Sequence, residues 1–315
     1  MKSAIAFAPA SVANFAVGFD LLGFALEGMG DTVRVTRIEE KTVRVRSIEI
    51  GEGLDRESFV ELPKEPEKNT AAMGLLEFIR EQKLEYGFEI EIKKGIPLGS
   101  GLGGSAASAA AALLAANAVL DRSLEKSALI KYAITGEAVA SGARHGDNVI
   151  PSLLGGVLIV ASEENTYARV ALKGDWHVAV LYPGFRLDTR RAREVLPKTI
   201  TLKAHTRAQT RLAMVLAGLA ENDPEKVRQF LVDEIIEPAR ASLIPDFYEI
   251  KRAALDAGAI GGSISGAGPT VFALTQGRVQ AERVLKSMGD AASTRYPKHL
   301  RMVSSISAEG ARVLK

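Results

Sequence analysis

Hydrophobic and polar residues alternate in several short stretches of the chain. Residues 88–93 alternate strictly, and residues 31–38 and 42–50 follow the same two-residue period. Because successive side chains of a strand point to opposite faces, this period predicts strands with one buried face and one face in water. The apolar runs at residues 155–160 and 177–182 predict two further strands, the first of them fully buried.

Elsewhere, apolar residues recur every three to four positions, which is the period of a helix with one buried face. On this pattern we expect helices at residues 69–83, 105–120, 123–141, 201–220, 224–232 and 247–257. The mixture of sheet and helix predicts an α+β fold. The polar segment 162–175 is the expected boundary between two domains, residues 1–168 and 169–315, although a long surface hairpin would look the same.

Composition narrows the class of protein. With 315 residues, 47% of them hydrophobic, the chain can bury one large core or two moderate ones. Its 40 basic and 38 acidic residues nearly balance, so no concentrated field favours nucleic acid or an anionic membrane as a partner. The absence of cysteine excludes disulfides and thiolate metal sites and fits a reducing cytosol. The apolar stretch before Pro9 is shorter than a signal peptide needs, and no run could span a membrane, so we expect a cytoplasmic protein.

A glycine-rich turn runs directly into an alanine-rich helix at residues 97–108. Its glycines are Gly99, Gly101, Gly103 and Gly104. Glycine adopts backbone angles closed to other residues, so consecutive N–H groups can point into one concavity beside the positive end of the helix. Ser105 and Ser108 add hydroxyl groups at its mouth. The segment therefore predicts a phosphate-binding loop.

The loop fits two common nucleotide-binding patterns only in part. The spacing of Gly99, Gly101 and Gly104 satisfies the dinucleotide-binding fingerprint. However, Asp121, at about the right distance downstream, ends a helix rather than the second strand that this fingerprint requires. A Walker loop would need Gly-Lys-Ser/Thr, which is missing. A glycine-rich connection that only lets the helix at 106–116 pack closely remains open.

Two further segments gather polar side chains. At residues 8–20, Asn14 and Asp20 flank a flexible glycine and can face a cationic ligand, although an Asx turn and a strand start account for them equally well. At residues 136–148, Glu137 lies late in a helix and precedes a polar turn. The carboxylates of Glu137 and Asp147 both suit Mg²⁺, which prefers oxygen ligands. Without further context, a solvated glutamate and a capped turn are the commoner interpretations.

Two arginines, Arg193 and Arg240, are candidates for binding a carboxylate, because a planar guanidinium pairs with it bidentately. The ordinary place of a single arginine is an exposed helix face, which we expect for Arg190 and Arg191. A second glycine-rich turn, residues 261–270, is expected to connect two strands tightly.

In order along the chain, these segments resemble five motifs of the GHMP kinases, a family that includes galactokinase and mevalonate kinase. The loop at 97–106 is similar to the family's ATP-binding motif, Pro-x-x-x-Gly-Leu-Gly-Ser-Ser-Ala, with Gly104 in place of the first serine. The resemblance implies that ATP is bound by Pro97, Leu98, Gly99, Ser100, Gly101, Leu102, Gly103, Gly104, Ser105, Ala106 and Ala107. Asn69 stands where family members contact the nucleotide base, although a helix N-cap accounts for it equally well.

Residues 136–148 resemble the family's Gly-Glu-x(7)-His-x-Asp-Asn motif at each named position. The resemblance implies that Glu137 is a Mg²⁺ ligand with Ser105 opposite, and that His145 and Asn148 hold the substrate hydroxyl. Asp147 matches the position used as a base in mevalonate kinase. Whether it removes a proton here stays open, because a loose transition state gains most from positioning and charge compensation.

The remaining segments resemble the branch of the family that acts on L-homoserine. That branch carries Pro-Ala-Ser-Ser-Ala-Asn-Leu-Gly-Pro-Gly-Phe-Asp near its start, which the run ending at Asp20 resembles, and Thr-x-x-Ala-Arg-x-x-Leu-Pro and Pro-x-Arg-x-x-Leu-Ile-Pro further on. The match implies that Asn14 and Asp20 contact the amino group of the substrate. Residues implied to complete the amino-acid site are Thr189, Arg193 and Arg240, as a carboxylate clamp, and Gly266.

The resemblance thus implies a two-domain α+β GHMP kinase architecture, with a mixed sheet-and-helix N-terminal domain, a ferredoxin-like C-terminal domain and ATP in the cleft. The implied reaction is ATP-dependent phosphorylation of the L-homoserine hydroxyl, with Mg²⁺, in threonine biosynthesis. A mevalonate-type kinase and a nucleotide-binding protein without catalytic activity are the alternatives. The sequence leaves the oligomeric state open, with a homodimer as one option.

Overall fold

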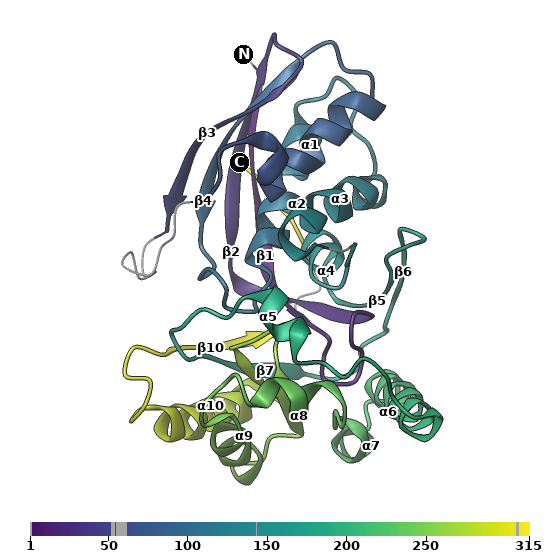
Figure 1. The fold of residues 1–315 in the computed structure, drawn as a ribbon, viewed down its shortest axis with the longest axis vertical. Helices are drawn as coiled ribbons and strands as arrows, with labels where there is room; N and C mark the ends of the chain where they lie inside the picture. The colour runs from purple at the N-terminus through teal and green to yellow at the C-terminus, as the bar shows by residue number, and fades with distance from the viewer. Residues whose placement is uncertain (1, 52–53, 55–61, 143, 307–308) are drawn as a thin grey trace.

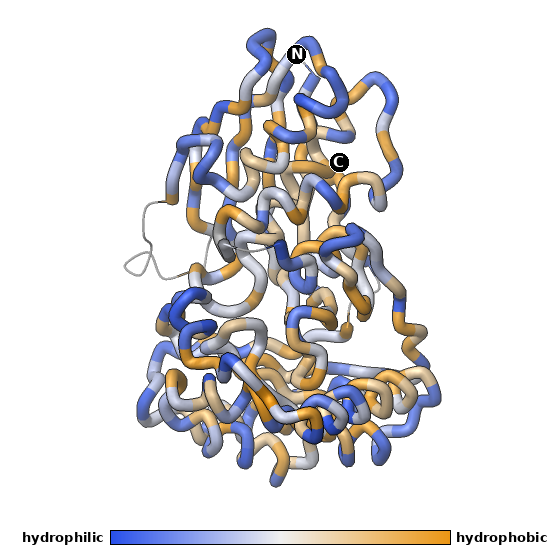
Figure 2. The backbone as a smooth tube through the Cα atoms, turned by 45° about the vertical axis from the view of Figure 1, so that its right-hand side comes forward, coloured by the Kyte–Doolittle hydropathy of each residue, from blue (hydrophilic) through white to orange (hydrophobic). Residues whose placement is uncertain are grey.

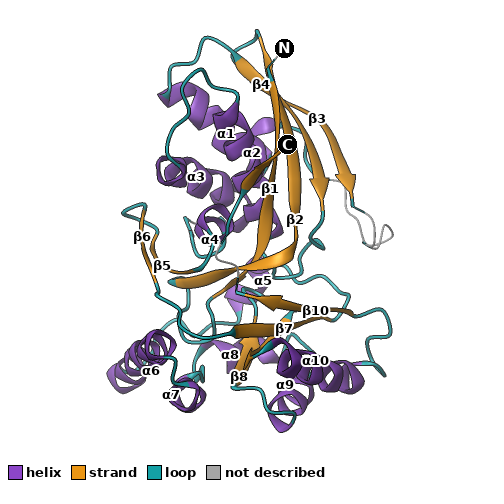
Figure 3. Cartoon of the chain, turned by 180° about the vertical axis from the view of Figure 1, so that it is seen from behind, coloured by secondary structure: helices purple, strands orange, loops and turns teal. Residues whose placement is uncertain are grey.

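A computed structural model describes residues 2–51, 54, 62–142, 144–306 and 309–315. Two β-sheets lie toward opposite ends of an elongated molecule (Figure 1). Helices α1–α4 cover one face of the first sheet, and helices α8, α9 and α10 pack against the second sheet (Figures 1 and 3). The α+β fold predicted from the sequence is confirmed.

The first sheet has the strand order β11-β1-β2-β4-β3, with β5 paired to β2 and β6 to β5. Its strands are β1 (Ser3–Ala13), β2 (Leu22–Ile38), β3 (Val43–Ile50), β4 (Gly87–Lys94), β5 (Val157–Ala161), β6 (Thr166–Arg169) and β11 (Arg312–Leu314). Strands β3 and β4 run parallel, and the other described pairs are antiparallel. The hydrophobic pattern of the sequence predicted β3, β4, β5 and residues 31–38 of β2.

The helices on this sheet are α1 (Thr70–Glu81), α2 (Gly104–Ala118), α3 (Ile130–Ser141) and α4 (Val149–Leu154), with short 3₁₀ turns at Pro66–Lys68 and Lys126–Leu129. Helix α2 is central, because it contacts β1, β2 and each of the other three helices. It is buried on nearly every side, from Ala106 to Asn117. Its run of alanines is what allows sheet and helices to approach it closely from all directions.

The second sheet has the order β10-β7-β9-β8, all antiparallel. Its strands are β7 (Trp176–Tyr182), β8 (Gly261–Ile264), β9 (Val271–Gln276) and β10 (Leu300–Ser305). The helices are α5 (Thr189–Glu194), α6 (Leu202–Glu221), α7 (Pro224–Phe230), α8 (Ile236–Ala241), α9 (Phe247–Asp256) and α10 (Arg278–Ala292). Counted along this half, the strand order is 4-1-3-2 with helical crossovers, which is the ferredoxin-like arrangement expected for the C-terminal part.

Several local expectations need correction. Residues 3–13 form strand β1, which the sequence pattern did not predict. Their small apolar side chains are mostly buried on both faces, so no alternation revealed the strand. The helix expected at 123–141 is interrupted, with a 3₁₀ turn before α3. The polar segment after β5 forms the β5–β6 hairpin and then a link to β7. Strand β11 returns to the first sheet, so the domain division at 168/169 stays a prediction.

The two halves share apolar contacts. Phe15 and Phe24, from the first half, pack against Phe272 of β9, with ring centroids 5.9 and 6.2 Å from that of Phe272. Hydrophilic residues concentrate in the peripheral turns of the chain (Figure 2). Within the described ranges, no helix is both long and apolar enough to cross a membrane. The shared core fixes how the two halves face each other.

Candidate active site

A cavity of about 380 Å³ is lined by residues of both halves of the chain. The predicted residues that line it are Asn14, Asp20, Asn69, 97–101, 103–105, Glu137, His145, Asp147, Asn148, Thr189, Arg193, Arg240 and Gly266. Leu102, Ala106 and Ala107 are fully buried in the core instead. The structure thus brings seven separate stretches of the sequence to one place.

The phosphate-loop candidate has the backbone geometry that glycine allows. Gly99, Gly101 and Gly103 have φ of +61°, +80° and +66°. A Cβ on Gly101 would overlap the carbonyl oxygen of Ser265 and lie 2.7 Å from that of Gly268. The loop therefore requires glycine here both for its conformation and for the close approach of the second glycine-rich turn.

The second glycine-rich turn, 261–270, includes strand β8 and packs on the loop. The Ser265 hydroxyl donates to the Gly101 carbonyl at 2.7 Å, and the Thr270 N–H donates to the Ser100 carbonyl at 3.2 Å. From the opposite side, the Ser11 N–H of β1 donates to the Leu102 carbonyl at 3.1 Å. The loop is thus held between the two halves of the molecule.

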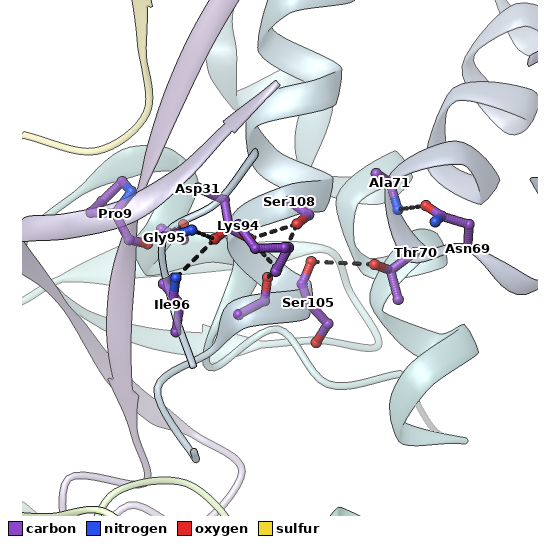
Figure 4. A network of polar contacts seen from close by, with 12 residues as sticks. Pro9, Asp31, Asn69, Thr70, Ala71, Lys94, Gly95, Ile96, Ser105 and Ser108 are labelled. Atoms are coloured by element: carbon purple, nitrogen blue, oxygen red, sulfur yellow. Dashed lines mark hydrogen bonds and ion pairs between the residues drawn. The ribbon is translucent and has the colours of Figure 1, made fainter. Parts of the chain in front are cut away.

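A buried charged cluster supports both ends of the loop (Figure 4). Asp31 accepts hydrogen bonds from the N–H groups of Gly95, at 2.9 Å, and Ile96, at 3.2 Å, where the chain enters the loop. The same carboxylate pairs with the ammonium of Lys94. Lys94 also donates to the carbonyl of Gly104, at 2.6 Å, and to Ser108, at 2.8 Å, just after the loop.

Sequence reasoning missed Asp31 and Lys94 as site residues, although the signal was present. Asp31 is in phase with the buried Val33 and Val35 of β2, and Lys94 is in phase with the buried Ile92 of β4. The two-residue period of a strand therefore directs both charges into the core. A buried charge needs a partner, so two such residues on neighbouring strands indicate an ion pair.

The proposed metal ligands lie in hydrogen-bond contact. The Ser105 hydroxyl donates to Glu137 Oε1 at 3.0 Å, connecting the first turn of α2 to α3. Burial raises the pKa of Glu137 to about 7, against the lowering effect of the Ser105 hydrogen bond, and the charge of Asp147 raises it further. A cation between these acids would relieve their repulsion.

The donor set at this place fits Mg²⁺. Ser105 and Glu137 offer oxygen atoms, and Mg²⁺ typically takes one or two carboxylates together with substrate phosphates rather than a complete protein cage.

Asp20 and Arg193, 173 residues apart, form a bidentate ion pair. The Arg193 Nη2 and Nη1 atoms lie 2.8 and 3.1 Å from the two carboxylate oxygens. His145 Nδ1 lies 3.6 Å from Asp20 Oδ2. The Phe19 ring lies under Arg193 and Arg240, at 5.4 and 5.3 Å from the guanidinium carbons. Sequence analysis assigned these two charges to opposite ends of a ligand, and the structure places them against each other.

The other arginine is buried and held by backbone carbonyls. Arg240 donates through Nη1 to the Gly266 carbonyl at 2.8 Å and through Nε to the Ala192 carbonyl at 3.0 Å. Asn14 Nδ2 donates to the same Gly266 carbonyl at 3.0 Å, and Asn14 Oδ1 accepts from the Asp20 N–H at 3.0 Å. Burial lowers the pKa of Arg240 to about 10, which leaves it charged at neutral pH. These bonds orient Asn14, Asp20 and Arg240 toward one cavity.

The polar turn before α4 adds three side chains. Burial raises the pKa of Asp147 to about 7, and the charge of Asp20 raises it further while Arg193 lowers it. Burial also lowers the pKa of His145, which favours the neutral ring, against the raising effect of Asp20. Asn148 Oδ1 accepts from the Ser11 hydroxyl at 2.9 Å.

Asn69 and Thr189 lie at helix starts on the cavity wall. The Asn69 side chain caps α1, accepting from the N–H groups of Ala71, at 3.0 Å, and Ala72, at 3.2 Å. The helix-cap interpretation is therefore correct, and its contact with a nucleotide base stays a prediction. Thr189 is the first residue of α5. Arg186, just before it, also lines the cavity and was not foreseen.

Both halves of the chain match known domain families. Residues 70–156 match the GHMP kinases N terminal domain, and residues 215–293 match the GHMP kinases C terminal domain. The chain belongs to the GHMP kinase family.

Relatives that match this chain over most of its length include proteins named homoserine kinase. A homoserine kinase of Xylella fastidiosa is 48% identical over 98% of this chain and 93% of its own length. One of Xanthomonas campestris is 49% identical, covering 89% of this chain and 84% of its own length. The crystal structure of a homoserine kinase from Cytophaga hutchinsonii superposes with a TM-score of 0.93 at 37% identity, covering 100% of this chain and 98% of that one.

Proposed function

We propose that this chain transfers the γ-phosphoryl group of ATP to the side-chain hydroxyl of L-homoserine, giving O-phospho-L-homoserine for threonine biosynthesis. The observation that carries the substrate assignment is the Asp20–Arg193 pair, which lines the same cavity as the glycine-rich loop. The full-length similarity to homoserine kinases supports it. Mevalonate kinases, at 14–15% identity, share only the fold.

The ion pair matches the two charges of an amino acid. An α-ammonium group can take the place of Arg193 beside Asp20, while the α-carboxylate takes the place of Asp20 beside Arg193 or faces Arg240. The charges removed from the protein pair are thus replaced by those of the ligand, which limits the cost of separating them. Mevalonate has a carboxylate but no ammonium group, so it would leave Asp20 without a partner.

The test is a coupled ADP-release assay with L-homoserine, L-threonine, mevalonate and shikimate, with the product identified by phosphorus NMR. We expect turnover with L-homoserine far above that with the others. Equal rates with mevalonate would reject the substrate assignment, and ATP binding without turnover of any hydroxyl compound would favour a non-catalytic protein.

We also propose a cytoplasmic location and a homodimer, the latter testable by sedimentation velocity.

In the proposed reaction, the glycine-rich loop and the start of α2 bind the phosphates through backbone N–H groups. Bound Mg²⁺, held by Ser105 and Glu137, would neutralise charge on the β- and γ-phosphates. His145 and Asn148 hold the substrate hydroxyl, and Asp147 accepts its proton. The pKa of Asp147, raised to about 7, lies near the pH at which a base is most effective.

Removing the Glu137 charge should weaken the metal dependence. Gln keeps an oxygen for the Ser105 hydroxyl but not the negative charge, so Glu137→Gln should raise the Mg²⁺ concentration for half-maximal activity by about 10–100-fold, a range seen when metal sites lose a supporting group. Titration of activity with Mg²⁺ at saturating ATP measures this. Glu125→Gln, at an exposed position, is the control, and an unchanged titration curve for Glu137→Gln would remove it from the metal site.

Replacing Arg193 should impair homoserine binding selectively. Lys keeps the charge but loses the fork that pairs bidentately with a carboxylate. We expect Arg193→Lys to raise the KM for L-homoserine by about 10–100-fold, the cost of a lost charge-assisted hydrogen bond, and the KM for ATP little. Steady-state kinetics with each substrate varied in turn measure both constants. The control is Arg191→Lys on the exposed face of α5; equal changes in both constants would argue against a substrate contact.

A further inference from the structure

Arg186 lies against the phosphate loop from the second half of the chain. It precedes α5 in the segment that follows β7. The N–H of its neighbour Leu187 donates to the Gly99 carbonyl at 3.0 Å, which fixes this segment to the loop. A Cβ placed on Gly99 would lie 3.2 Å from Arg186 Cβ and 3.3 Å from its Nε. The guanidinium stem therefore crosses directly over the first glycine of the loop, at the cavity wall.

The other cations of the cavity have partners. Lys94 is neutralised by Asp31 beneath the loop, and Arg193 is neutralised by Asp20. Both pairs are needed elsewhere, the first to hold the loop and the second to recognise the amino acid. These two side chains therefore offer little uncompensated positive charge to a nucleoside triphosphate.

Among the remaining cationic side chains of the cavity, Arg186 is the candidate for binding phosphate. Arg240 is buried and donates to two backbone carbonyls on the far side of the amino-acid site. Lys68 lies 3.6 Å from Glu65. Arg186 is exposed, and among the described residues it has neither an ion pair nor a side-chain hydrogen bond. A guanidinium with its donors available beside the loop matches the geometry of phosphate oxygens.

We infer that Arg186 is a further phosphate-binding residue, which contacts the polyphosphate of ATP from the side of the cavity opposite α2. This inference rests on the proposed ATP-dependent kinase activity. It gives the two halves of the chain complementary roles: backbone N–H groups and the helix end come from the first, and a cationic side chain comes from the second.

Binding measurements separate this inference from the overall reaction. Arg186→Met keeps an unbranched stem against Gly99 and removes the charge. By calorimetry with Mg²⁺ present, we expect its Kd for ATP to rise about tenfold, near the lower end for a charge-assisted hydrogen bond, while adenosine binding is unchanged. The Kd of the wild-type chain for ATP should also rise more steeply with added KCl than that of the variant, because salt screens the lost attraction.

The matched control is Arg190→Met, four residues further on and exposed on α5. It should bind ATP like the wild type. A Kd for ATP within twofold of wild type in Arg186→Met, or an equal loss in Arg190→Met, would overturn the inference. The readout is nucleotide affinity, so it tests the role of Arg186 independently of turnover. Failure to phosphorylate homoserine would refute the proposed function without deciding whether Arg186 binds phosphate.

Discussion

An Asp31→Ala variant is expected to lose about 3–5 kcal/mol of its free energy of unfolding, the usual cost of breaking a buried ion pair. The substitution leaves the Lys94 ammonium buried without its counter-charge. It also removes the acceptor of two backbone N–H groups, those of Gly95 and Ile96. Urea denaturation followed by circular dichroism measures the loss.

The double variant Asp31→Ala/Lys94→Met separates the charge from the geometry. Removing both charges avoids the uncompensated ion, so we expect it to be more stable than Asp31→Ala alone. The phosphate loop should still bind ATP more weakly, because neither end of it is held. Glu282→Ala, which breaks the exposed Arg278–Glu282 pair, should hardly change stability. A loss no larger for Asp31→Ala than for Glu282→Ala would contradict the assignment of a structural ion pair.

Local periodicity was enough to place most of the secondary structure. The strict alternation in β4 and the helical period in α1 and α6 come from one buried face each, and such elements carry their pattern in the sequence. Strand β1 shows no such alternation in its sequence, because its residues are mostly buried on both faces. Helical spacing predicted α2 at residues 105–120, although this helix is buried on nearly every side and has no broad polar face that would sharpen the pattern.

The sequence predicted which residues line the site better than it predicted which of them contact one another. The resemblance to family motifs collected residues that the fold brings to one cavity, from Asn14 to Gly266. Which of them contact one another depends on long-range geometry. The Asp20–Arg193 pair joins segments 173 residues apart, and no spacing in the sequence indicates it. Arg186 lies outside the quoted motifs, and only the fold places it over Gly99.

The second large effect is expected at Asp147. If this carboxylate accepts the hydroxyl proton, Asp147→Asn should lower kcat by about 10²–10⁴-fold, the usual contribution of a general base. The KM values should change little, because the asparagine keeps the shape of the side chain. Single-turnover measurements with saturating L-homoserine separate this step from product release. Asp188→Asn, at an exposed helix cap where asparagine also accepts the hydrogen bond, is the matched control.

The pH dependence distinguishes a base from a positioning group. A base acts in its deprotonated form, so the rate should fall as pH drops below the pKa of Asp147, which burial raises to about 7. An asparagine has no proton to gain, so the part of the acidic limb that comes from Asp147 should vanish from the variant. Both profiles are measured at saturating Mg²⁺, because burial raises the pKa of Glu137 to about 7 as well. A variant with less than a tenfold loss and the wild-type pH profile would show that the hydroxyl proton leaves by another route. In that case, positioning and charge compensation by the remaining groups would carry the reaction, as a loose transition state allows.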